Sequence, residues 1–276
     1  MLDELLPLLR TPTLHRPGLT VAGQHNVRRA PDGSLDTATL VGPGGDDPSV
    51  VVDGIWHAMG TGRRPRTLAQ LSNVVPPTPQ LYESVWRVRS LGLLSGRDFP
   101  IAEELRELDV ALGDVDGAAV IDIGCSEGLY SRHLAHRGAR PLAIDHSIPF
   151  LRRTRHRAQQ ARVGVAPIQA VAQQLPVLDG VLDGAVIGGT LNEIGDRRAA
   201  LAELARVTKP GAPVFVMSLG RATSRIGQIL QRGLGLTGIE FPDAQRTAAE
   251  FSTAGFEVVG QRVDGLVIRT ILRRLT

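Results

Sequence analysis

The sequence predicts an α/β protein with a doubly wound, mostly parallel sheet that ends in an antiparallel hairpin, preceded by a small β-rich module. From residue 118 onward, short apolar runs alternate with amphipathic segments, as buried strands alternate with helices in doubly wound folds. The last two runs, 257–263 and 266–272, are separated only by Asp264-Gly265, which permits a hairpin but leaves no room for a crossover helix. The five earlier runs are 119–123, 142–144, 167–170, 185–187 and 213–217.

The chain divides by composition into three parts. Residues 1–60 are rich in Gly, Pro, Asp and Thr, with β-type runs at 19–22, 37–41 and 49–52, so they predict a small β module. Residues 61–113 have a helical pattern interrupted by prolines, which indicates a connector or lid. Residues 114–276 form the predicted cofactor-binding domain.

Composition bounds the class of protein. The chain has 276 residues, 42% of them hydrophobic, so it can bury one substantial core and a smaller accessory module. Its longest apolar stretches, such as 184–191, are far shorter than the roughly 20 residues of a membrane-spanning helix. Asp3 and Glu4 are unlike a basic secretory leader, and a single cysteine, Cys125, suits a reducing compartment. We therefore expect a cytoplasmic protein with no membrane span.

Positive charge is spread along the chain. The formal net charge is only +3, although the calculated pI is about 9.7. The densest basic run is Arg152, Arg153, Arg155 and Arg157, which fits the solvated face of a helix better than a phosphate-binding patch. We therefore expect no nucleic-acid partner, because proteins that bind nucleic acid concentrate positive charge on one face.

The stretch after the first predicted strand of the domain has the pattern of a cofactor-binding loop. Asp122 is followed by Gly124-x-Ser126-x-Gly128 and then by a helical segment. The glycines let the backbone approach a ligand closely, and the amides at a helix start are donors to a carboxylate. Asp145 lies 23 residues after Asp122, at the end of the next strand, where an acidic side chain can accept both hydroxyls of a ribose.

With these motifs, residues 118–276 resemble a class I S-adenosylmethionine-dependent methyltransferase. Two later segments agree in order: 173–183 resembles the family's Leu-Pro-Phe stretch, and 203–211 resembles its Glu-x-x-Arg-Val-Leu-Lys-Pro-Gly-Gly segment. The resemblance implies a Rossmann-like methyltransferase sheet. It also implies S-adenosyl-L-methionine as the cofactor and S-adenosyl-L-homocysteine as the product.

The resemblance assigns residues to parts of the cofactor. The glycine loop would line its methionine part, Asp145 would bind the ribose, and His146 would lie against the adenine. Val171 stands where the family often has an Asp that accepts from the adenine amino group. Cys125 is expected to be a small buried filler within the loop. The predicted cofactor-binding set is Asp122, Gly124, Cys125, Ser126, Gly128, Tyr130, Asp145, His146, Ala172, Gln173, Gly188 and Gly189.

The first module resembles the N-terminal zinc ribbon of quinone C-methyltransferase-like proteins and of a group of ribosomal-RNA guanine methyltransferases. The corresponding segments, 11–14, 42–45 and 52–55, lack the cysteines of that ribbon. Structural zinc needs four nitrogen or sulfur ligands, and only His15, His25 and His57 remain nearby. We therefore expect a degenerate ribbon without metal.

Methyl transfer to oxygen or nitrogen benefits from a general base, and the polar candidates are Glu193, His146, Tyr130 and Tyr82. Glu193 follows the fourth strand and is preferred, although an acidic residue there also suits a helix N-terminus. Tyr82 lies on a helix that either covers the substrate pocket or packs on the core.

An insert at 219–242 carries regularly spaced Ile and Leu residues. It suggests a hydrophobic acceptor, and a dimer contact or ordinary lid packing are the alternatives. The predicted function is methyl transfer to a small, partly apolar metabolite in specialised metabolism, with a homodimer possible. The alternatives are an rRNA or tRNA methyltransferase, and a cofactor-binding protein with other chemistry or no turnover.

Overall fold

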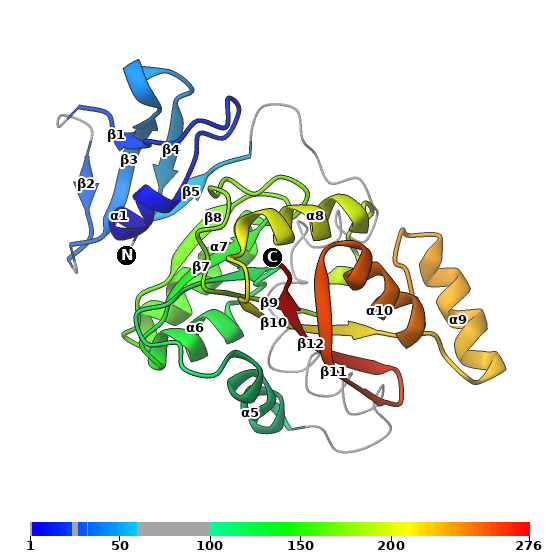
Figure 1. Ribbon diagram of the computed structural model, residues 1–276. Coiled ribbons are helices and arrows are strands. Elements are labelled where there is room, and N and C mark those ends of the chain that lie inside the picture. Colours follow the sequence, from blue (N-terminus) through cyan, green and yellow to red (C-terminus); the bar gives the residue numbers. More distant parts are fainter. Residues whose placement is uncertain (1, 24–26, 32, 60–99) are drawn as a thin grey trace.

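The computed structural model describes residues 2–23, 27–31, 33–59 and 100–276 (Figure 1). A single 12-stranded sheet runs through the molecule in the order β1-β3-β4-β5-β8-β7-β6-β9-β10-β12-β11, with β2 paired to β3. The predicted α/β, doubly wound fold is therefore confirmed. None of the helices in these residues combines the length and apolar character needed to cross a membrane.

The centre of the sheet consists of five parallel strands. β6 and β9 are buried along their whole length. This is expected for mostly apolar strands of a parallel sheet, because helices cover both of its faces. The order of the strands reverses between β6 and β9, because β7 and β8 follow on one side and β10 on the other. The strands are β6 (Ala119–Ile123), β7 (Arg140–Asp145), β8 (Ala166–Gln169), β9 (Gly184–Gly188) and β10 (Pro213–Leu219).

Helices connect and cover these strands. Ser147, Asp196 and Asp243 each cap a helix, accepting from the backbone N–H of Phe150, Ala199 and Arg246 respectively, which satisfies one of the free amides at each start. The helices of the domain are α5 (Ile101–Leu112), α6 (Leu129–His136), α7 (Ile148–Gln160), α8 (Arg197–Val207), α9 (Arg225–Gly235) and α10 (Ala244–Thr253), with the 3-10 turn η4 (Thr190–Asn192) after β9.

The predicted C-terminal hairpin is present. β11 (Phe256–Asp264) and β12 (Val267–Arg274) pair antiparallel through a two-residue turn at Gly265-Leu266, one position later than the predicted Asp264-Gly265 joint, because Asp264 still pairs with Val267. β12 also pairs antiparallel with β10. A register shift between Val258 and Gly260 marks a bulge in the edge strand. The insert after β10 contains α9, which projects from the body of the molecule (Figure 1).

The N-terminal residues form an antiparallel meander that joins the main sheet. Its last strand pairs in parallel with β8, Trp56 opposite Ile168 and His57 opposite Gln169, so the meander continues the sheet at that edge. Of the predicted connector at 61–113, residues 101–112 are helix α5, and 60–99 lie outside the described residues. The elements are α1 (Leu2–Leu5), η1 (Leu6–Leu8), β1 (Thr20–Val21), β2 (Arg28–Arg29), β3 (Leu35–Val41), η2 (Pro43–Gly45), β4 (Ser49–Val52) and β5 (Ile55–His57).

Candidate active site

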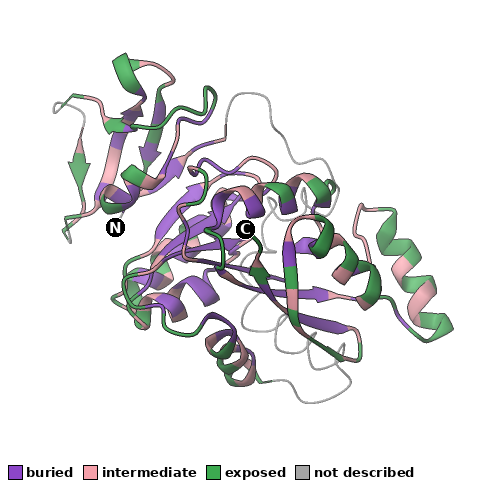
Figure 2. Ribbon diagram, in the orientation of Figure 1, coloured by how far each residue is buried: buried purple, intermediate pink, exposed green. Residues whose placement is uncertain are grey.

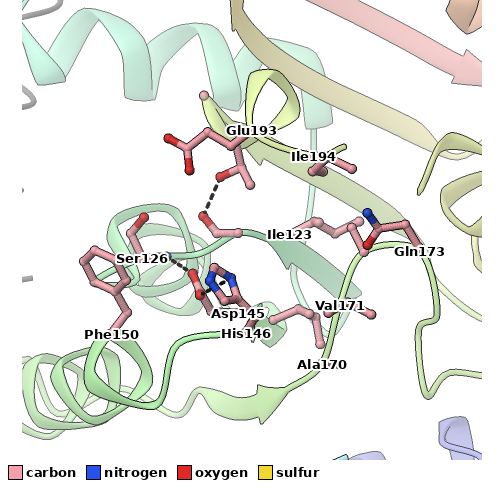
Figure 3. A pocket seen from close by; sticks show the side chains of 15 residues that line it. Ile123, Ser126, Asp145, His146, Phe150, Ala170, Val171, Gln173, Glu193 and Ile194 are labelled. Carbon is pink, nitrogen blue, oxygen red and sulfur yellow. Dashed lines mark hydrogen bonds and ion pairs between the residues drawn. The ribbon is translucent and has the colours of Figure 1, made fainter. Parts of the chain in front are cut away.

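A cleft lies at the carboxyl ends of β6, β7 and β9, beside the point where the strand order reverses. This is where open α/β sheets bind their ligands. It contains about 680 Å³ of space, open solvent at its mouth included. The lining residues come from the ends of the strands and the loops after them (Figure 3): Ile123, Gly124, Ser126, Ile144, Asp145, His146, Phe150, Ala170, Val171, Ala172, Gln173, Gly189, Thr190, Glu193 and Ile194.

The loop after β6 has a backbone that depends on glycine. Gly124 and Gly128 have φ angles of 69° and 74°, and Ser126 shares this left-handed region at 49°. A Cβ on Gly124 would collide with the side chain of Thr190, whose hydroxyl donates to the Gly124 carbonyl. A Cβ on Gly128 would lie 2.6 Å from Cγ2 of Thr154. The loop is therefore packed tightly against its neighbours and presents its backbone to the cleft.

Asp145 faces this loop from the end of β7. One of its carboxylate oxygens accepts from the Ser126 N–H at 3.0 Å, and the other accepts from the Ser147 N–H at 2.9 Å, with Nδ1 of His146 at 3.4 Å. Burial raises the pKa of the carboxyl, against the lowering effects of His146 and of these hydrogen bonds. The carboxylate lines the cleft, so it is placed to accept from ligand hydroxyls.

Several predicted cofactor residues support the cleft from behind. Asp122 accepts from both the backbone N–H and the hydroxyl of Ser131, at 3.1 and 2.6 Å, and so ties β6 to α6. The Tyr130 hydroxyl donates to Glu104 on α5, and its ring occupies the space above Gly188, where a Cβ would lie 2.5 Å away. These residues hold the loop and the strand end in place.

Cys125 is in the loop, but its side chain points into the core. It is buried with Ile55, Ala143 and Leu151, and its sulfur lies 3.8 Å from the hydroxyl of Thr154. Burial, together with the nearby carboxylates, raises the pKa of the thiol well above its usual value. The thiol is therefore neutral, and only the backbone of Cys125 reaches the loop surface.

The loop after β8 forms another wall of the cleft. Ala172 and Gln173, two of the predicted cofactor-binding residues, line the cleft together with Val171. Phe150 and Ile194 also line it, and the sequence analysis did not select them. For Phe150 a signal existed, because an aromatic residue in the first turn of the helix after Asp145 must lie close to the carboxylate.

A chain of hydrogen bonds connects this wall to the N-terminal meander. Nε2 of Gln169 donates to the carbonyl of His146 at 3.2 Å, and Oε1 of Gln169 lies 3.0 Å from Nδ1 of His57 on β5. The meander therefore stabilises the position of His146, the residue after Asp145, through Gln169.

Of the candidate bases, Glu193 and His146 both line the cleft. Glu193 follows η4 and is half-buried, and Figure 3 shows it across the cleft from Asp145 and His146. Tyr82 lies outside the described residues. A base could thus act from the Glu193 side while the Asp145 side holds a ligand.

The densest basic run is engaged in ion pairs. Arg153 and Arg157 each approach the buried carboxylate of Glu127 at 2.6 Å, and Arg155 pairs with Asp36 of β3 at 2.7 Å. These arginines stabilise α7 against the glycine loop and the meander. Within the described residues, no group of three or more His, Cys, Asp or Glu side chains is arranged to hold a metal ion.

Taken together, a glycine loop after β6, a carboxylate ending β7 and a cleft at the reversal of strand order define an enzyme that binds an adenosyl cofactor. The site fits S-adenosyl-L-methionine, because Gly124 and Ser126 of the left-handed loop line the cleft beside Asp145, and a carboxylate at the end of this strand can accept from ribose hydroxyls.

The comparisons specify the family. Residues 121–216 match the methyltransferase domain family. Demethylmenaquinone methyltransferase of Corynebacterium urealyticum is 31% identical over 186 residues, which are 59% of this chain and 76% of that protein. The chain belongs to the class I S-adenosylmethionine-dependent methyltransferases.

Other similarities are more partial. The ubiquinone biosynthesis O-methyltransferase of Alkalilimnicola ehrlichii is 32% identical over 111 residues, which are 40% of this chain and 45% of that protein. A solved structure with the same fold is geranyl diphosphate C-methyltransferase from Streptomyces coelicolor, in complex with Mg²⁺, geranyl diphosphate and S-adenosyl-L-homocysteine. The two structures superpose with a TM-score of 0.56 at 13% sequence identity, and the superposition covers 63% of this chain and 79% of that chain.

Proposed function

We propose that this methyltransferase acts on a small, partly apolar acceptor of specialised metabolism. The observation that carries the proposal is the convergence of Ser126, Asp145 and Glu193 on one cleft from three different strand ends. The named activities of the relatives, on demethylmenaquinone and in ubiquinone biosynthesis, support a small, partly apolar acceptor. We further propose a cytoplasmic enzyme that does not act on RNA, since three arginines of its densest basic run are held in ion pairs.

Each wall of the cleft has a proposed role. The backbone of Gly124 and Ser126 holds the methionine part of the cofactor, and Asp145 accepts from both ribose hydroxyls. His146, Phe150 and the 171–173 segment enclose the adenine. The apolar side chains of Phe150, Val171 and Ala172 exclude water from this side of the cleft.

The cofactor supplies an activated methyl group, so the protein mainly aligns the acceptor and removes a proton where one must leave. Glu193 is the proposed base, because it lines the cleft on the side away from Asp145. Its carboxylate would accept the proton from an acceptor hydroxyl or amine as the new bond to carbon forms. With an acceptor of this kind, Glu193→Gln should lower kcat and leave cofactor affinity unchanged.

The ribose assignment is tested by calorimetry with S-adenosyl-L-methionine and S-adenosyl-L-homocysteine. Asp145→Ala should weaken both affinities by about 100-fold or more, because two hydrogen bonds to a charged group are lost. Glu257→Ala, an exposed carboxylate on β11, is the matched control and should change neither. Unchanged affinity in a folded Asp145→Ala protein would refute the assignment. The acceptor class is then found by screening metabolites and ribosomal RNA for a mass gain of one methyl group.

We also propose that residues 1–60 are a degenerate zinc ribbon in which hydrogen bonds replace the metal. Support comes from the two loops, at 11–16 and 42–47, that correspond to the lost cysteine pairs. Asp47 accepts from the backbone N–H groups of Thr13 and Leu14, both at 2.7 Å, and Arg16 pairs with Asp46 at 2.6 Å. Measuring the zinc content of the purified protein tests this, and stoichiometric zinc would contradict it.

A further inference from the structure

Helix α9 exposes an apolar face to solvent. Most of its large apolar side chains are more than half exposed, with Ile226 at 75% and Ile229 and Leu230 at 64% each. Figure 2 shows that the helix stands apart from the body and has no buried residue. We call the set Ile226, Ile229, Leu230, Leu234 and Leu236 the α9 apolar face.

Hydrogen bonds fix this orientation. Oε1 of Gln231 accepts from the Ala222 N–H at 2.8 Å, and its Nε2 donates to the Gly220 carbonyl at 2.9 Å. Gln228 donates to the Ala222 carbonyl at 3.0 Å. The polar side of α9 is thus turned toward its own loop, whereas amphipathic helices usually turn their apolar side to the protein.

The charge around this face has one sign. Arg221, Arg225 and Arg232 are exposed, and the sequence from 219 to 239 contains no Asp or Glu. Arg225 and Arg232 are seven residues apart, so they lie on the same side of the helix, at the border of the apolar face. None of the three forms an ion pair with another residue in the part of the chain that the structure describes.

The insert is anchored beside the active-site cleft. The side-chain N–H groups of Asn192 donate to the carbonyls of Leu219 and Glu240, at 2.7 and 2.6 Å, and its oxygen accepts from the Leu219 N–H at 2.7 Å. Both ends of the insert are therefore held by one residue. The next residue, Glu193, lines the cleft.

From these observations we propose that α9 lies in the surface of an anionic lipid bilayer. The Ile and Leu side chains would enter the acyl boundary, and the three arginines would bind the anionic headgroups. Because the insert is anchored at Asn192, this brings the mouth of the cleft to the membrane, where an apolar acceptor is concentrated. A second copy of the chain fits less well, since pairing two such helices would bring arginines together with no acidic residue in either.

Co-sedimentation with vesicles tests the proposal without any acceptor, so its outcome is separate from that of the proposed function. The full-length protein should bind vesicles of phosphatidylcholine mixed with phosphatidylglycerol, bind phosphatidylcholine alone much less, and be released by salt. Arg225→Gln/Arg232→Gln should lower partitioning about 25-fold, since each arginine near an anionic surface contributes about fivefold. Ile229→Ser/Leu230→Ser should lower it at least about tenfold through lost apolar burial.

A matched control separates this from general surface hydrophobicity. Val259→Ser/Val263→Ser removes two apolar side chains of similar exposure from β11 and should leave vesicle binding unchanged. Cofactor affinity, measured by calorimetry, should be the same in all three variants, which shows that they are folded. Two results would overturn the proposal: equal binding by the α9 variants and the parent protein, or no vesicle binding together with a dimer that Ile229→Ser/Leu230→Ser dissociates in light scattering.

Discussion

The N-terminal meander and the 219–242 insert both add to the methyltransferase domain, and they are attached to it by different kinds of contact. The meander adds its strands to the sheet through β5 and buries Trp56 completely, with the indole N–H donating to Ser49 at 2.9 Å. The insert contributes α9, which buries none of its residues and is held by hydrogen bonds at its base. The meander is therefore part of the fold, whereas the insert is free to meet a partner.

The largest effect should follow from weakening the meander. Trp56→Ala removes a fully buried side chain between β4 and β8 and should lower the free energy of unfolding by about 3–5 kcal/mol in chemical denaturation. Val50→Ala, 44% exposed on β4, is the control and should change it by less than about 0.5 kcal/mol. If the Trp56→Ala protein unfolded in two transitions, and the second had the same midpoint as the single transition of the parent protein, the meander would be a separate folding unit. The contrast between an integral meander and a peripheral insert would then be wrong.

An intermediate effect is expected at the base of the insert. Asn192→Ala leaves the backbone groups of Leu219 and Glu240 without their side-chain partner, which should cost about 1–3 kcal/mol. The loss should be local, so limited trypsin digestion should cut at Arg225 and Arg232 faster than in the parent protein. Arg198→Ala, exposed on α8, serves as control. Unchanged cleavage would mean that Asn192 does not anchor the insert.

The smallest effect concerns the charge at the junction with the meander. Burial would raise the pKa of Glu203, but hydrogen bonds from Arg206 and the Leu175 N–H, and the charges of Arg206 and Arg10, lower it overall. The ionised carboxylate therefore stabilises the fold above its unfolded pKa of about 4.3, and this stabilisation is lost as pH falls through the lower folded pKa. Glu203→Gln should be less stable than the parent protein near neutral pH, and the difference should shrink in strong acid. A constant difference across pH would exclude this role.

The central sheet could be predicted from sequence because buried parallel strands appear as continuous apolar runs. The predicted run 119–123 coincides with β6, and the short Asp264-Gly265 joint predicted the hairpin, whose turn lies at Gly265-Leu266. The pairing of β5 with β8 could not be predicted, because it joins three residues to a strand more than a hundred positions away, with no local signal for the partner.

Some residues of the candidate site could also be predicted from the sequence, and others could not. Asp145 and Ser126 were identified because a motif places them at the ends of strands. The sequence gives no hint that Tyr130 bonds to Glu104, because that contact depends on how α5 packs. Ile194 reaches the cleft through the geometry of the chain after η4, and a pattern of apolar spacing does not distinguish such a residue from core.

The grip of Asn192 on both Leu219 and Glu240 closes the insert into a loop whose two stems meet at one amide. Such a loop can be lengthened, shortened or rewritten in composition without moving β10 or the segment that leads into α10. The insert can therefore be replaced as a unit. Such a replacement would change the surface to which the enzyme binds and the acceptors that reach its cleft, and it would leave the cofactor-binding residues in place.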